Sequence, residues 1–309
     1  MPIGLLRPGE KAPPADPNAW QRNKRLEDVV IDGLKWTDTH QLLVGMAEHV
    51  SQDGVWDLET ISPSLVASSC RLQRVHKYLG HAAVPGPTNS LMQLREGQPD
   101  PVTQLNFLRG FCFEGVIVTA LRRSPHLKVI ASAPDFVPKA KWGGIDFSAH
   151  PDVYVGFEGP GPGINDAWLE LIQVKCPSWW ALDGLHRFPE RLREHYNLQI
   201  QCEMLVCRMA GYPVSGSNLL IGTWEGTPAA SSPSIECYNV PYEPETANKV
   251  IEIAKEIRHD ADRFKARGVL PEAIPFKYRR PAIFPCGYCK YSRVANGPLG
   301  IPGCEQVGR

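Results

Sequence analysis

The sequence predicts an α/β protein in which a mixed sheet is flanked by helices. Two apolar segments, Asp152–Phe157 and Trp168–Cys176, have the length and composition of strands, and the Gly- and Pro-rich residues 158–163 predict a long hairpin loop between them. Helical patterns stand on either side, over about Val102–Arg123 and Pro189–Ala210. Helices before and after a sheet that contains hairpins are typical of an α/β sandwich.

The remaining elements are marked by the residues that begin and end them. Ser62 can cap a helix whose first position suits Pro63, and Gly80 follows the expected end of that helix. Gly211 and Gly268 stand at the ends of two later helices. In chain order, we expect a helix around Thr39–Val50, a helix from Pro63 through Cys70 to Tyr78, a strand at Leu127–Ala131, strands at Leu219–Trp224 and Ser234–Val240, and a helix over Ala247–Phe264.

Length and composition predict a soluble protein with a sizeable core. We expect a partly helical N-terminal extension, residues 1–55, followed by one domain, residues 56–309. Basic and acidic residues number 33 each, which counts against an overall basic nucleic-acid-binding protein but allows a local basic groove around an acidic site. No apolar run has membrane-spanning length and the first residues lack a signal-peptide layout, so we expect a cytoplasmic protein without membrane partners.

The segment Gln173-Val174-Lys175 carries the clearest chemical signal. Alternate strand residues share a face, so Gln173 and Lys175 point together, and Asp152 at the start of the paired strand can lie beside them. An aspartate and neighbouring oxygens can hold Mg²⁺ or Mn²⁺, while a lysine positions water and offsets charge at phosphorus. The plainer interpretation is a strand whose lysine extends into solvent beside Pro177.

Two helices carry further candidates for the same site. Glu114 lies in the apolar segment Phe111–Val118, where a carboxylate is costly without a partner, and it could reach the same metal. Tyr196 and Gln199 share one helix face with Glu203 and Val206, so they could contact DNA beside a phosphate site. Taken singly, these residues also fit a surface glutamate and an ordinary polar stripe.

These motifs together resemble the PD-(D/E)xK nuclease superfamily, in particular its RecB-like and lambda-exonuclease-like groups. The matching segments are Pro151-Asp152, Gln173-Val174-Lys175-Cys176-Pro177 and Tyr196-Asn197-Leu198-Gln199-Ile200-Gln201. The resemblance implies a restriction-endonuclease-like core, Asp152, Gln173 and Glu114 as metal ligands, Lys175 as the catalytic lysine, and Tyr196 and Gln199 as substrate contacts. Gln173 departs from the family's acidic residue, and Gly144-Ile145-Asp146 also resembles its aspartate motif. We prefer Asp152 because its shorter connection to Gln173 makes a simpler hairpin.

Four of the nine cysteines have a spacing that suits a metal site. Cys286 and Cys289 form a CxxC pair, Cys304 follows after 14 residues, and Cys70 offers a fourth ligand from an early helix. This layout resembles the CRISPR-associated, AddB-type and mitochondrial iron–sulfur exonucleases, which implies a 4Fe–4S cluster that joins the N- and C-terminal segments. A zinc site on the same cysteines and a chance CxxC are the alternatives.

Basic and aromatic side chains supply candidate DNA contacts. Arg71 begins a basic cluster with Arg74, His76 and Lys77, and Trp179 and Trp180 follow the catalytic strand where they could stack on unpaired bases. Solvated basic residues and core tryptophans are the plainer alternatives. Lys139, Lys141 and Trp142 form a similar group before the active strand.

The function that these signals favour is metal-dependent hydrolysis of DNA. By the resemblance, the protein is an exonuclease on single strands or DNA ends in recombination, repair or processing, of prokaryotic or phage origin, with recombination or CRISPR-type protein partners. The runner-up is a catalytically weak DNA-binding or assembly module that keeps the fold and cluster, which Gln173 favours. A zinc-stapled protein of unrelated function is the third hypothesis.

Overall fold

The structure is a computed structural model that describes residues 20–50, 58–68, 70–80, 101–133, 135–157, 169–177, 182, 190–223, 234–269 and 271. The chain divides into two compact units. The first unit combines Met1–Gly54, Leu108–Lys139 and Ala149–Pro244, and the second combines Val55–Phe107, Ala140–Ser148 and Glu245–Arg309. Among the described residues, no helix is both long enough and apolar enough to span a membrane.

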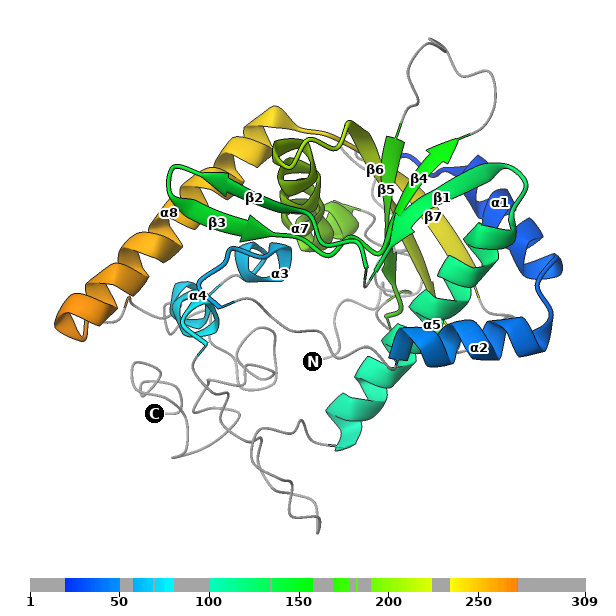
Figure 1. Ribbon diagram of the computed structural model, residues 1–309, viewed down its shortest axis with the longest axis horizontal. Coiled ribbons are helices and arrows are strands. Elements are labelled where there is room, and N and C mark those ends of the chain that lie inside the picture. Colours follow the sequence, from blue (N-terminus) through cyan, green and yellow to red (C-terminus); the bar gives the residue numbers. More distant parts are fainter. Residues whose placement is uncertain are drawn as a thin grey trace, which may run out of the picture. The chain divides into compact units, whose positions relative to one another are not determined.

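A mixed five-stranded sheet forms the centre of the first unit (Figure 1). Its order is β1 (Leu127–Ser132), β4 (Val153–Phe157), β5 (Leu169–Lys175), β6 (Val214–Thr223) and β7 (Ser234–Pro241). Strands β5 and β6 are parallel, and the other neighbouring pairs are antiparallel. Parallel neighbours need a crossover, which here contains helix α7 (Glu190–Met209). The mixed sheet and the β4–β5 hairpin pairing confirm the predicted α/β class.

Helices cover both faces of this sheet because its strands alternate their apolar side chains. Leu171 of β5 packs in a core with Ile200 and Met204 of α7. Ile172 and Val174 pack in a second core with residues from α1 (Lys24–Lys35) and α5 (Pro101–Arg123). The second core includes Leu26, Val29 and Val30 of α1 and Phe113, Ile117 and Leu121 of α5. Gln173 and Lys175, which alternate with Ile172 and Val174, therefore lie on the α7 face.

Helix α1 is an element that the sequence analysis does not predict. Asn23 caps it by accepting a hydrogen bond from the Leu26 N–H, and Arg22 forms an antiparallel bridge with Tyr238 of β7. Gly33 permits its close approach to α5, because a Cβ there would lie 2.2 Å from the Ala120 carbonyl oxygen. Residues 20–35 therefore contribute to the sheet's core, although the predicted boundary at residue 55 itself stays a prediction. The predicted helix α2 (Thr39–Val50) follows as expected.

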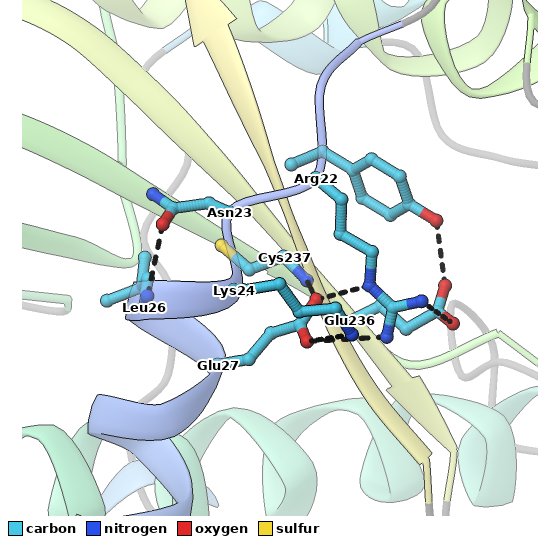
Figure 2. Close-up of polar contacts among 8 residues, drawn as sticks. Arg22, Asn23, Lys24, Leu26, Glu27, Glu236 and Cys237 are labelled. Carbon is cyan, nitrogen blue, oxygen red and sulfur yellow. Dashed lines mark hydrogen bonds and ion pairs between the residues drawn. The ribbon is translucent and has the colours of Figure 1, made fainter.

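A buried carboxylate ties α1 to β7 through a set of ionic and hydrogen-bonding contacts, shown in Figure 2. Glu27 Oε1 accepts from Arg22 Nε at 2.5 Å and from the Cys237 N–H at 3.0 Å, and its Oε2 accepts from Lys24 Nζ at 3.0 Å. Arg22 also pairs with Glu236 at 3.1 Å. We call Arg22, Lys24, Glu27 and Glu236 the Glu27 cluster.

The second unit holds α3 (Pro63–Val66), α4 (Arg71–Tyr78), the hairpin β2 (Lys139–Trp142) and β3 (Ile145–Ser148), and α8 (Pro244–Arg267). Ser62 caps α3 and Pro63 begins it, as predicted. The prediction of one continuous helix to Tyr78 is wrong. The chain leaves the helix after Val66 and starts a new one at Arg71, because Arg74 Nε and Nη2 take up the Ser68 and Val66 carbonyls at 2.5 and 3.1 Å.

The β2–β3 hairpin is also absent from the sequence-based expectations. Its two strands have four residues each, with β2 largely exposed and β3 largely buried, so neither shows the alternation that marks a half-buried strand. Gly143 and Gly144 join them with φ values of +54° and +79°, which is the conformation that a two-residue hairpin turn of the primed kind requires. The other predicted strands and helices are confirmed, although β6 begins five residues before the expected Leu219, at Val214.

Candidate active site

Asp152 and Gln173 meet at the end of the β4–β5 pair. Val153 lies opposite Ile172 in the antiparallel register, so the next step of the ladder brings Asp152 opposite Gln173. Asp152 Oδ2 accepts hydrogen bonds from Gln173 Nε2 and from the Val174 N–H, both at 2.6 Å. The Asp152 carbonyl in turn accepts from the Ala133 N–H at 3.0 Å. Main-chain contacts therefore hold Asp152 on both sides, to Val174 through its carboxylate and to Ala133 through its carbonyl.

The amide nitrogen of Gln173 has a hydrogen-bond partner among the described residues, and the amide oxygen has none. A carboxylate only accepts hydrogen bonds, so the Nε2 group faces Asp152 and the Oε1 atom is turned away from it. Gln173 is 2% exposed, and its Oε1 is buried without a hydrogen-bond partner among the described residues. A buried acceptor that lacks a partner costs about 1–3 kcal/mol, so a binding partner for this oxygen would recover that energy.

Helix α7 brings a second carboxylate to the same face of β5. Glu203 is 2% exposed, and its Oε1 accepts from Gln199 Nε2 at 3.1 Å, one turn earlier on the helix. Its Oε2 is buried with no hydrogen-bond partner in the described part of the chain. The predicted helix face of Tyr196, Gln199 and Glu203 therefore forms, and Gln199 is directed at Glu203.

These side chains lie close enough together for their charges to act on one another. Burial alone would lower the pKa of Lys175, but the negative charges of Asp152, Glu203 and Glu114 outweigh burial and raise it. Burial, and next the charge of Glu114, raises the pKa of Asp152 well above its ordinary value, although Lys175 acts in the opposite direction. We call Asp152, Gln173, Lys175 and Glu203 the Asp152 cluster, with Glu114 of α5 beside it.

Burial also brings the pKa of Glu203 into the neutral range. Burial raises its pKa to about 7, and the Glu114 charge adds to this effect. The Lys175 charge and the hydrogen bond from Gln199 favour the ionised form but do not outweigh burial. Burial also raises the pKa of Tyr196, whose ring lies near enough to Lys175 for the lysine's charge to oppose that rise.

The cluster fits a hard divalent cation better than it fits an empty polar core. Three carboxylates face one ammonium group there, and two buried oxygens lack hydrogen-bond donors in the described residues. Oxygen ligands from carboxylates and amides are what Mg²⁺ and Mn²⁺ prefer. Within the described part of the chain, no three His, Cys, Asp or Glu side chains are placed to hold a metal by themselves, so the amide oxygen of Gln173 would have to take part.

The remaining predicted site residues lie elsewhere or outside the described residues. Arg71 belongs to the second unit, where its guanidinium pairs with the buried Asp260 carboxylate of α8. Asp146, the alternative aspartate, lies on β3 with a 53% exposed side chain at 3.3 Å from Lys141. Cys70 is buried at the N-cap of α4. Trp179, Trp180, Cys286, Cys289 and Cys304 fall outside the described residues.

Glu203 is the residue that sequence reasoning left out of the site. Its position was visible, since it shares a helix face with Tyr196 and Gln199. What the sequence could not show is that Lys175 of β5 would face that helix and that the carboxylate would be fully enclosed. A glutamate four residues after a glutamine is otherwise common on exposed helix surfaces.

Comparisons with known proteins give little beyond this geometry. No known protein-family model matches the chain, and no curated protein matches it. Solved structures that match include an alkaline exonuclease from Laribacter hongkongensis, with 14% sequence identity and a TM-score of 0.43 over 72% of this chain and 96% of that one. A likeness of this extent assigns neither family nor activity, so the function proposed below depends on the site itself.

Proposed function

We propose that this protein is a metal-dependent deoxyribonuclease that acts at the Asp152 cluster. The observation that carries the proposal is the buried contact of Asp152 with Gln173, beside Lys175, with two oxygens left without donors among the described residues. The motif resemblance gives the finer proposal, which is an exonuclease on single-stranded DNA or DNA ends. Proteins of recombination, repair or CRISPR-type assemblies are the partners that the same resemblance implies.

The chain's own residues would divide the work of phosphodiester hydrolysis as follows. Asp152, Gln173 and Glu114 would hold Mg²⁺ or Mn²⁺, and that ion supplies Lewis acidity at the phosphate. Lys175 stays protonated because neighbouring carboxylates raise its pKa, so its ammonium group can orient the attacking water and stabilise negative charge at phosphorus. Tyr196 and Gln199 line the same face of α7, and Tyr196 is the substrate contact that this arrangement favours.

The direct test is hydrolysis of end-labelled single- and double-stranded DNA by the full-length protein, with Mg²⁺, Mn²⁺ or EDTA. We expect cleavage with either metal and none with EDTA. The rival function, a DNA-binding or assembly module, is favoured by the neutral amide at position 173, where an acidic residue would attract the metal more strongly. DNA binding without metal-dependent cleavage under all these conditions would replace the nuclease by that rival.

We also propose a 4Fe–4S cluster on Cys70, Cys286, Cys289 and Cys304. Cys70 alone of these four lies within the described residues, buried at the start of α4, where its thiol forms neither a disulfide nor a capping hydrogen bond. A cluster that joins residues so far apart in sequence would restrict the unfolded chain, which is worth about 4–5 kcal/mol in the ideal case.

Anaerobic purification tests this cluster by colour, iron and inorganic sulfide. We expect the wild-type protein to be brown. Cys70→Ala should lose the colour, the iron and thermal stability. Cys237→Ala, which removes a core thiol outside the proposed set, should retain them. A protein that contains zinc and no iron would show that the four cysteines hold zinc and not an iron–sulfur cluster. Full iron content in Cys70→Ala would remove Cys70 from the ligand set.

A further inference from the structure

The Asp152 cluster contains one carboxylate, that of Glu203, to which the proposed function gives no role. Glu203 is as deeply buried as Gln173, and each presents one oxygen that no described residue hydrogen-bonds. An isolated polar atom of this kind is rare in folded proteins and points to an absent partner. Two of them in one cluster, both oxygens and both pure acceptors when Glu203 is ionised, point to the same partner, a cation.

Two plainer explanations of Glu203 do not account for this geometry. If Glu203 only formed an ion pair with Lys175, its Oε2 would have a donor, but no hydrogen bond from a described residue reaches that atom. If Glu203 were a protonated acid enclosed beside α7, its Oε2 hydroxyl would need an acceptor, and no described residue provides one. Gln199 holds Oε1, and this contact fixes the direction of Oε2.

The composition of the site supplies the remaining argument. Strand β5 provides a neutral amide at Gln173, so the strand pair contributes a single carboxylate, Asp152, to a cation site. A neutral ligand adds no charge and lowers affinity for Mg²⁺ or Mn²⁺. A glutamate at position 173 would be destabilising without metal, because a negative oxygen would replace the Nε2 group that lies 2.6 Å from Asp152. The missing charge is therefore better placed on another element.

We propose that Glu203 supplies from α7 the acidic metal ligand that strand β5 lacks at Gln173, and that Gln199 is the residue that positions it. This inference rests on the proposed function, since it concerns the same cation site. Gln199 then contacts the metal ligand Glu203 and does not contact DNA directly. The metal ligands are then Asp152, Gln173 and Glu203, while Glu114, the ligand that the resemblance implies, acts on Asp152 and Glu203 through its charge.

A charge-exchange series in the full-length protein tests the proposal by Mn²⁺ binding, measured by calorimetry and by electron paramagnetic resonance. Glu203→Gln leaves the site with one acid fewer and should weaken Mn²⁺ binding at least tenfold. The double variant Gln173→Glu/Glu203→Gln has the wild-type number of carboxylates and should regain most of that affinity. Glu170→Gln is the matched control, since Glu170 is a half-buried acid on the opposite face of β5 and its substitution should leave binding unchanged.

Thermal unfolding in EDTA separates a metal ligand from a structural residue. Because Glu203→Gln removes a buried charge with no donor at Oε2, the metal-free variant should unfold at the wild-type temperature or higher. The rise in melting temperature that Mn²⁺ gives the wild type should shrink in the same variant.

Each outcome bears on one claim. Wild-type Mn²⁺ affinity in Glu203→Gln, or no recovery in a folded double variant, would overturn the assignment of Glu203. Loss of folding in Glu203→Gln without metal would make it a structural residue instead. If the variants change Mn²⁺ binding as expected but the wild-type protein never cleaves DNA, this inference is supported and the proposed nuclease function is wrong.

Discussion

The Glu27 cluster and the Asp152 cluster lie in the same unit and bury their acids to a similar depth, but they differ in completeness. In the Glu27 cluster both carboxylate oxygens of Glu27 accept from donors, and the two acids face two bases. In the Asp152 cluster two buried oxygens lack donors among the described residues, and its two acids, with Glu114 beside them, face one base. The Glu27 cluster holds a helix to a strand, whereas the Asp152 cluster keeps two oxygens for which no described residue provides a donor.

The pKa values carry the same contrast. Burial alone would raise the pKa of Glu27, but hydrogen bonds from Arg22, Cys237 and Lys24 outweigh it and lower the pKa. Around Glu203 the opposing interactions are too few, and burial raises its pKa to about 7. Folding therefore favours the ionised form of one acid and the protonated form of the other.

The largest expected effect is on catalysis. Asp152→Ala and Lys175→Ala should each reduce DNA hydrolysis about 10²–10³-fold or more, because each removes charge stabilisation at the reacting phosphate. Circular dichroism and thermal unfolding should show a folded protein in both cases. Cleavage at the wild-type rate by either variant would break the comparison, because the incomplete cluster would then not be the active site.

The next effect should fall on stability and not on activity. Glu27→Ala leaves the buried Cys237 N–H without its acceptor and Arg22 without its nearest partner, so we expect a loss of about 1–3 kcal/mol in the free energy of unfolding. Denaturant titration measures this, with Glu27→Gln as the milder control that keeps an acceptor. Turnover per folded molecule should stay at the wild-type value, and a large fall would mean that the two clusters are functionally linked.

The third effect is a dependence of stability on pH. The folded-state pKa of Glu203 is about 7 against an ordinary 4.5, so its stabilising contribution is fully present below about 4.5 and is lost as pH rises through 7. Asp152, whose pKa is also raised, adds to this loss. The melting temperature of the EDTA-treated protein should fall by several degrees across this range, and less in Glu203→Gln. A flat profile in the wild type would contradict the electrostatic description of the cluster.

The smallest expected effect concerns Gln173. Gln173→Glu places a carboxylate against Asp152, so the metal-free protein should melt at a lower temperature while Mg²⁺ binds more tightly. We expect activity at saturating Mg²⁺ to be preserved or raised by less than tenfold. The Mg²⁺-dependent shift in melting temperature is the measurement, and a folded but inactive variant would show that the amide itself has a role in the reaction.

The sequence predicted most of the sheet and its hairpin because those segments are strongly apolar and bounded by glycine and proline. It missed α1, although Leu26, Val29 and Val30 have helical spacing, because the Pro-rich residues before it suggested an extension. It missed β2 and β3 because strands of four residues are too short to show a periodic pattern. It joined α3 to α4 because nothing local marks the break that Arg74 stabilises.

The site was predicted in part. Strand alternation was enough to place Gln173 and Lys175 on one face and Asp152 beside them, and the structure brings these residues together. The role of Glu203 depends on which face of α7 meets β5, and that is set by the packing of Leu171 against Ile200 and Met204. Such tertiary contacts leave no trace in the spacing of a single helix.

The β4–β5 pairing has a consequence for how the chain tolerates change. Asp152 and Gln173 stand at one end of this antiparallel pair, while residues 158–168 connect the strands at the other end, after Phe157 and before Leu169. Insertions in that connection, such as a peptide tag, would leave the register of Asp152 and Gln173 unchanged and should be tolerated. A single residue inserted within β5 is different, because a slip of one position would turn Gln173 and Lys175 towards the α5 side and bring Val174 into their place.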